Sequence, residues 1–163
     1  TFGQKDMTGS VISPFDAFLL NRGLKTLDIR LDRHCQNAAL LAEMLQAHPA
    51  VKKVYYPGLP DFEGHAIAKK QMRQFGGVLS FEVKADRAAT AHFLNHLELV
   101  TIAVSLGDTE TLVQQPATMT HSAYTPEELA AAGIAEGLIR VSVGLESSSD
   151  LLAAFKAGLD KIK

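Results

Sequence analysis

Two features in the last third of the chain have residue types that suit the binding of a small anion. One is a Ser-Leu-Gly-Asp turn, residues 105–108, at the end of an apolar run; the other is Arg140, inside the strand-like run 138–143. A guanidinium in a half-buried strand is costly unless it meets an anion. Its planar fork suits a carboxylate, and a hydroxyl with exposed amides at a Gly turn can hold the same anion from its other side. These residues predict a small carboxylate ligand between Ser105 and Arg140.

The strand that carries Arg140 has two interpretations. If it lies at the edge of a sheet, the guanidinium is in solvent, because charged residues commonly protect sheet edges. Alternation places Arg140 opposite a β-branched face made of Ile139, Val141 and Val143. If that face is the core, Arg140 points away from it, toward a surface on which another domain can dock.

The elements that must position these residues follow from hydrophobic spacing and from Pro and Gly punctuation. The expected helices span 13–21, 24–47, 65–74, 86–96, 125–133 and residues from 148 onward. The expected strands span 51–56, 78–83, 99–104 and 138–143. Short strands with polar alternate faces predict an α+β fold, in which helices pack on one face of a mostly antiparallel sheet of about four strands.

The long helix 24–47 is expected to bury one apolar stripe. Its members are Leu24, Leu27, Leu31, Cys35, Ala38, Leu41 and Leu45. Cys35 follows His34, a pairing that could activate a thiolate, but a position on this stripe favours a small buried hydrophobe.

Three further sets of polar residues could form a metal or catalytic site. His92 and His96 have the i, i+4 spacing of zinc ligands, but no third ligand is evident and a half-exposed helix face is favoured. Asp108 and Glu110 form a possible acid–base pair, with solvated turn residues as the favoured interpretation. His121 receives no chemical role, and we predict no metal site.

Composition narrows the class of protein. The chain has 163 residues, of which 47% are hydrophobic and 21% charged, with a net charge of −2, so neither nucleic acid nor an anionic membrane is an expected partner. No apolar run approaches the ~20 residues that span a bilayer. One cysteine excludes internal disulfides and favours the reducing cytoplasm. Because the chain opens with Thr1, we expect a piece of a longer protein.

Several sequence blocks, in order and over essentially the whole chain, resemble one enzyme family. They are KDMTGSVISPFDAFLLNRGLKTLDIRLDRHCQNA, QFGGVLSFEV, SLGDTETL, PATMTHSAYTPEEL and GIAEGLIRVSVGLE. Together they are similar to the pyridoxal-phosphate-dependent enzymes of cysteine and methionine metabolism, and within that family most similar to the methionine γ-lyases.

The resemblance implies a domain organisation. Residues 1–163 would form a single C-terminal domain of a fold-type I pyridoxal-phosphate enzyme. Within it, residues 1–22 would connect to a missing large cofactor domain and 23–163 would form the small substrate-binding domain. The Schiff-base lysine and the groups that hold the cofactor would lie upstream. We therefore expect no catalytic or cofactor-binding residue here, no bound pyridoxal phosphate, no activity of this piece alone, and a bare apolar face where the large domain docks.

The resemblance also implies a reaction, the α,γ-elimination of L-methionine to methanethiol, 2-oxobutyrate and ammonia. The family's matching arginine binds the substrate α-carboxylate, so the expected substrate-binding residues are Ser105 and Arg140, flanked by Val104 and Leu106. The cystathionine-cleaving members often carry an acidic residue where this chain has Val104, which favours methionine or a related sulfur amino acid. The full-length enzyme would be a homotetramer.

Two other functions remain open. The same C-terminal blocks occur in cystathionine γ-lyase, cystathionine γ-synthase and the O-acylhomoserine sulfhydrylases. A different class of protein, a non-catalytic binding or scaffold domain, would keep the fold without the chemistry.

Overall fold

The computed structural model describes residues 9 and 12–162, which divide into two compact units, one ending at Arg30 and the other beginning at Leu31. Positions 1–8 and 10–11 of the expected connecting segment lie outside the described residues. Helix α2 (Pro14–Leu24) belongs to the first unit. Ser13 caps it by accepting a hydrogen bond from the Asp16 amide at 3.1 Å. The helix continues three residues past its predicted end at Asn21, and none of its residues is buried.

Apolar side chains are conspicuous on the surface of this first unit. Its exposed large hydrophobic residues are Ile12, Phe15, Phe18, Leu19, Leu20, Leu24, Leu27 and Ile29. Monomeric soluble proteins rarely expose large contiguous apolar patches, so this composition is typical of a surface that another polypeptide covers.

Helix α3 (Leu27–Ala47) buries the C-terminal part of the predicted stripe, Ala38, Leu41 and Leu45, but not its N-terminal part. Its buried residues are His34, Asn37, Ala38, Leu41, Ala42 and Leu45. Leu27 and Leu31 are exposed and Cys35 is only half-buried, so the prediction of a buried thiol was wrong. The reason is polar: the Asn37 amide donates to the carbonyls of Gly144 and Glu146 at 3.1 and 3.0 Å, which turns the polar His34–Asn37 side inward.

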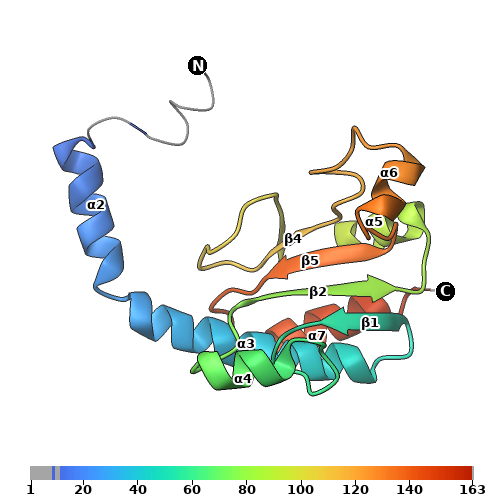
Figure 1. Cartoon of the computed structure of the whole chain (residues 1–163), viewed down its shortest axis with the longest axis horizontal. Helices are drawn as coiled ribbons and strands as arrows, with labels where there is room; N and C mark the ends of the chain where they lie inside the picture. Colours follow the sequence, from blue (N-terminus) through green and yellow to red (C-terminus); the bar gives the residue numbers. More distant parts are fainter. Residues whose placement is uncertain (1–8, 10–11, 163) are drawn as a thin grey trace. The chain divides into compact units, whose positions relative to one another are not determined.

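Five strands form one sheet in the order β1-β2-β5-β4-β3 (Figure 1). They are β1 (Val51–Tyr55), β2 (Val78–Val83), β3 (Thr101–Ile102), β4 (Leu112–Gln114) and β5 (Leu138–Ser142). All pairings are antiparallel except the parallel pair β3–β4. The predicted α+β fold with a mostly antiparallel sheet is confirmed. The additional strand is β4, whose three residues are too few to show an alternating pattern.

One face of the sheet is covered by α3, α5 (Arg87–Asn95) and α7 (Ser148–Leu159). The Phe81 ring of β2 lies edge-on to Phe93 of α5 and Phe155 of α7, at centroid distances of 6.5 and 6.3 Å. Ile139 and Val141 of β5 are fully buried in the same core. The β-branched face of the last strand is therefore the core face.

Two short helices complete the described chain, α4 (His65–Gln71) and α6 (Pro126–Ala131). The predicted capping box of α6 is present, with the Thr125 amide donating to Glu128 at 2.8 Å and the Glu128 amide to the Thr125 hydroxyl at 3.3 Å. In the part of the chain that the structure describes, no helix has both the length and the apolarity needed to cross a membrane.

Candidate functional site

Arg140 lies in the centre of the sheet, not at its edge. Strand β5 pairs with β2 on one side and with β4 on the other, so that Arg140 stands opposite Ser80 and Gln114. The interpretation of Arg140 as a solvated edge charge is therefore wrong. Its side chain is half-buried on the face turned away from the helical core.

The structure brings Arg140 together with the Ser105 turn. The guanidinium Nη2 donates to the carbonyl oxygens of Val104 and Ser105, at 3.0 and 2.8 Å. Both acceptors are main-chain atoms, whereas the sequence pointed to the Ser105 hydroxyl. The arginine thus fixes the position of the turn through its backbone.

Gly107 gives the turn its shape. Its φ of +82° lies in the left-handed region that side chains disfavour, and its amide donates to the Ser142 hydroxyl at 2.9 Å. This amide is therefore engaged within the domain, so the expectation that it is exposed for an anion was wrong. Asp108 accepts from the Thr109 amide at 2.6 Å, as the favoured interpretation of solvated turn residues predicts.

The far end of the same loop, residues 103–111, is held by Glu146. The Glu146 carboxylate accepts from the Thr111 hydroxyl at 2.7 Å and from the Thr111 amide. The Thr111 hydroxyl in turn accepts from the Gly144 amide at 2.8 Å. Together with the parallel register of β3 and β4, these bonds fix both ends of the loop.

Two buried polar atoms near this loop have no hydrogen-bond partner among the described residues, the Arg140 Nε and the Gln114 Oε1. The Gln114 residue is only 3% exposed. Buried polar groups nearly always have hydrogen-bond partners. Two neighbouring buried groups without partners therefore indicate a place where ligand binding or a local rearrangement supplies the missing hydrogen bonds. Sequence reasoning missed Gln114, because the strand that carries it was not predicted.

Val104 and Leu106 flank Ser105 with apolar surface. They are 54% and 60% exposed, respectively, unusually open for such side chains. The four predicted site residues therefore form one surface, with a cation on one side and two apolar side chains beside it. This arrangement has the chemistry to bind a small molecule with a carboxylate at one end and an apolar chain at the other.

His92 of α5 and His96, which follows the helix, lie close together. The rings of His92 and His96 stack at 4.1 Å, and His96 Nδ1 lies 2.8 Å from the His92 carbonyl. Within residues 9 and 12–162, no three His, Cys, Asp or Glu side chains cluster as metal ligands. A cavity of about 520 Å³ opens beside His96, lined also by α7, and touches neither Arg140 nor Ser105.

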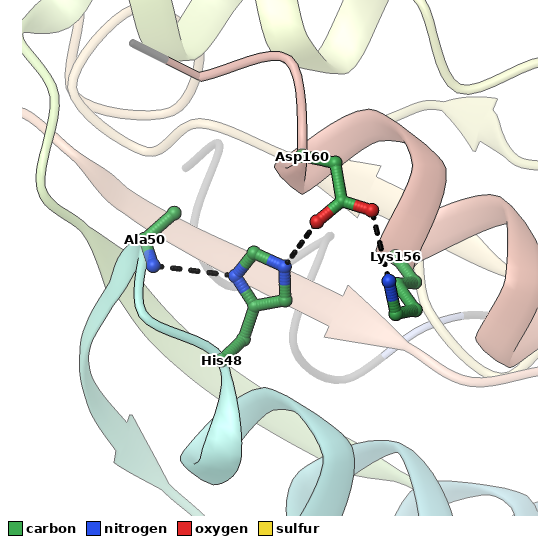
Figure 2. Close-up of polar contacts among 4 residues, drawn as sticks. All are labelled: His48, Ala50, Lys156 and Asp160. Carbon is green, nitrogen blue, oxygen red and sulfur yellow. Dashed lines mark hydrogen bonds and ion pairs between the residues drawn. The ribbon is translucent and has the colours of Figure 1, made fainter.

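A second polar cluster lies where α3 and α7 end and just before β1 begins (Figure 2). The buried His48 ring accepts the Ala50 amide at Nδ1, at 3.2 Å, so the neutral ring carries its proton on Nε2 and donates it to Asp160 at 3.1 Å. Lys156 donates to the other Asp160 oxygen at 2.9 Å. The hydrogen bonds from Lys156 and then His48 lower the Asp160 carboxyl pKa.

A third polar cluster lies on the outward face of β1 and β2. Glu82 accepts hydrogen bonds from Tyr55 and from Lys52, the latter at 2.8 Å. Burial by itself raises the pKa of Glu82, but these two hydrogen bonds and the charges of Lys52 and Lys53 together outweigh it, so the net pKa is lowered. The hydrogen bond from Tyr55 to Glu82, together with the partial burial of Tyr55, raises the pKa of Tyr55 to about 12. With Leu129 of α6, Glu82 lines a hollow of about 440 Å³.

Comparison with known proteins identifies the family to which this fold and surface belong. The family profile for Cys/Met metabolism PLP-dependent enzymes, in which PLP is pyridoxal phosphate, matches residues 2–160. The chain belongs to this family.

Several characterised members of the Cys/Met metabolism family resemble the chain closely. It is 56% identical over 160 residues to an L-methionine γ-lyase of Porphyromonas gingivalis, covering 98% of this chain and 40% of that protein. It is 50% identical over 151 residues to a cystathionine β-lyase of Coxiella burnetii, covering 93% of the chain and 39% of that protein. The chain thus spans about two-fifths of the length of these relatives.

A solved structure from the same family shares the fold. It is the cystathionine γ-synthase of Xanthomonas oryzae in complex with aminoacrylate and cysteine, with a TM-score of 0.85 and 51% identity. The match covers 91% of this chain and 38% of that one.

The family depends on pyridoxal phosphate. Of the ten lysines, Lys5 and Lys163 fall outside the described residues, and the other eight are all exposed. No cofactor-binding role is assigned to any of them.

Proposed function

We propose that this chain is the C-terminal substrate-binding part of a pyridoxal-phosphate-dependent methionine γ-lyase, which converts L-methionine to methanethiol, 2-oxobutyrate and ammonia. The observation that carries the proposal is Arg140, a half-buried cation at the centre of the sheet whose guanidinium is held against the Ser105 turn. Membership of the family supports the reaction class, and the 56% identity to a methionine γ-lyase is the argument for that branch.

Arg140 serves in this proposal to hold the α-carboxylate of the substrate. Carboxylate oxygens accept stronger, charge-assisted hydrogen bonds than amide carbonyls do, so a bound carboxylate competes well for donors that now reach Val104 and Ser105. Anchoring this end fixes the orientation of the Cα–H bond, which is where proton removal begins. Arg140 and Ser105 then position the substrate, and the acid–base groups lie elsewhere in the enzyme.

Val104 and Leu106 support methionine over cystathionine. Their exposed apolar side chains flank the turn and suit a methyl thioether, whereas the distal end of cystathionine carries charges that need polar partners. Relatives of similar identity include a cystathionine β-lyase and a cystathionine γ-synthase, so cystathionine is the alternative substrate. The choice between the two substrates is the finer part of the proposal.

The rest of the intact enzyme, in this proposal, holds the cofactor and covers the apolar surface of the first unit. When bound, pyridoxal phosphate supplies an electron sink for the carbanion chemistry. The chain corresponds to about two-fifths of its relatives, which leaves ample length for such a domain. The proposal includes a homotetramer of the intact enzyme, which sedimentation equilibrium would test.

The proposal is tested by replacing Arg140 in the intact enzyme that carries this chain. Arg140→Ala removes a charge-assisted contact worth about 1.5–3 kcal/mol, so catalytic efficiency falls by roughly tenfold to more than a hundredfold on every amino-acid substrate. Arg140→Lys restores only part of the loss, because an ammonium lacks the planar fork. Unchanged efficiency in Arg140→Ala would refute the site, and an intact protein without lyase activity would favour a binding or scaffold module.

The choice of substrate is tested by Val104→Glu in the same enzyme. This change is expected to alter the ratio of efficiencies on methionine and cystathionine more than the overall rate, because the new charge meets the distal end of the substrate. Ile67→Glu, at an exposed position of α4, is the matched control. If the unmodified enzyme prefers cystathionine to methionine, the proposed function changes from methionine γ-lyase to a cystathionine-acting enzyme, whatever the effect of Val104→Glu.

A further inference from the structure

Gln114 and Arg140 present complementary polar atoms that the described structure leaves unpaired. The Arg140 Nε–H is a donor and the Gln114 Oε1 is an acceptor, and both are buried. The two residues stand directly opposite each other in the antiparallel pairing of β4 with β5. Side chains in such positions have Cβ atoms about 4.5–5.5 Å apart, well within the reach of an arginine and a glutamine.

Burial decides which partner the Nε–H can have. Because solvent does not reach this nitrogen, a substrate arriving at the surface does not reach it either. Its acceptor must come from the protein. Asn37 Oδ1 is also buried and unpaired in the described residues, but its side chain contacts the backbone of Gly144 and Glu146 from α3. Gln114 is the residue whose register places it beside Arg140.

We propose, on the premise of the function proposed above, that Gln114 is a positioning residue for Arg140. Its Oε1 accepts the Nε–H when a substrate carboxylate draws the Nη groups away from the carbonyls of Val104 and Ser105. This bond fixes the plane of the guanidinium, so that the Nη edge meets the carboxylate with both donors aligned. The action is on Arg140 alone, and Gln114 makes no contact with the substrate.

The expected signature is a loss confined to ligands that carry a carboxylate. L-norleucine and n-pentylamine are suitable probes, because they differ only in the α-carboxylate. In the intact enzyme, Gln114→Met keeps the volume and removes the acceptor. It is expected to raise the inhibition constant of norleucine by roughly tenfold and that of pentylamine by less than about twofold. Gln71→Met, at an exposed position of α4, is the matched control and should change neither constant.

Two further variants separate positioning from a structural role. In an Arg140→Ala background, Gln114→Met should have no additional effect on norleucine, because the group it positions is gone. Gln114→Glu retains an acceptor at the same place, so it should keep more of the preference for norleucine over pentylamine than Gln114→Met does. Equal losses for both probes, or an undiminished loss in the Arg140→Ala background, would overturn the inference.

The two proposals fail in different ways. If Arg140→Ala abolishes the preference for norleucine over pentylamine while Gln114→Met preserves it, the role of Gln114 is wrong and the carboxylate site stands. If Arg140→Ala itself leaves the preference intact, the carboxylate site is wrong and the inference about Gln114 falls with it.

Discussion

The His48 cluster and the Arg140 cluster are both polar and both partly buried, yet their hydrogen bonding differs. Each ring nitrogen of His48 has a partner, Ala50 on one side and Asp160 on the other. Arg140 also makes two good bonds, but its Nε and the facing Gln114 Oε1 lack partners among the residues described. In the first cluster both nitrogens of the His48 ring have hydrogen-bond partners. In the second cluster one donor and one acceptor have none within the described part of the chain.

This difference separates a polar group whose hydrogen bonding is already complete from one whose hydrogen bonds can rearrange when a ligand binds nearby. A fully paired buried group has already exchanged its water for protein, so a ligand has little to offer it. An incompletely paired group carries a desolvation cost that binding can relieve. The contrast predicts that the two clusters respond oppositely when stability and ligand affinity are measured on the same variants.

The largest expected effect on stability is at His48. His48→Ala removes a buried ring and its hydrogen bond to the Ala50 amide, so the free energy of unfolding should fall by about 1–3 kcal/mol. Urea denaturation of the chain measures this, with His96→Ala at an exposed position as the control. An equal response of the two variants would show that the His48 hydrogen bonds contribute nothing.

A smaller and pH-dependent effect is expected at Tyr55. Because Glu82 has a lowered pKa, its stabilising interactions are present above its ordinary value of 4.5 and disappear as the pH falls through the lowered value. Tyr55→Phe removes one hydrogen bond to Glu82, at a cost of about 0.5–1.5 kcal/mol near neutral pH. The cost should shrink below pH 4.5 and be absent in a Glu82→Gln background. Denaturation curves across pH 3–7 test both, and a pH-independent cost would contradict them.

The smallest expected effect on stability is at Arg140, although its effect on activity is the largest. Arg140→Met gives up two hydrogen bonds to carbonyls and also removes an unpaired buried N–H, so the free energy of unfolding should change by less than about 1 kcal/mol. Thermal unfolding of the chain, with Arg22→Met on α2 as the control, measures this. A loss as large as that of His48→Ala would erase the distinction between the clusters.

Period-two alternation was enough to place Arg140 opposite the face of Ile139, Val141 and Val143, but it left open whether that face was the core. The pattern of Ile139, Val141 and Val143 is unambiguous, and all three are buried. It could not reveal β4, because three residues show no period, and without β4 the pairing of Gln114 with Arg140 is invisible. The central position of β5 in the sheet could not be predicted either, since strand order depends on tertiary pairing and not on local spacing.

The buried face of α3 shows a different limit. Helical spacing admits more than one apolar face, and the sequence favoured the one with Cys35. The structure buries Ala38, Leu41 and Leu45 as predicted, but beside them it buries His34 and Asn37 in place of Cys35. The His34 and Asn37 side chains contact the backbone after β5, more than a hundred positions away along the chain. Hydrophobic periodicity carries no information about such distant polar contacts.

Arg140 holds the turn by its main chain, and this has a consequence for how the enzyme can diverge. The carbonyl oxygens of residues 104 and 105 are the same whatever side chains those positions carry. Exchanging Val104 for another residue therefore alters the surface presented to a substrate without dismantling the support beneath it. The support itself depends on the two residues that make the turn's geometry, Arg140 through its guanidinium and Gly107 through its φ of +82°.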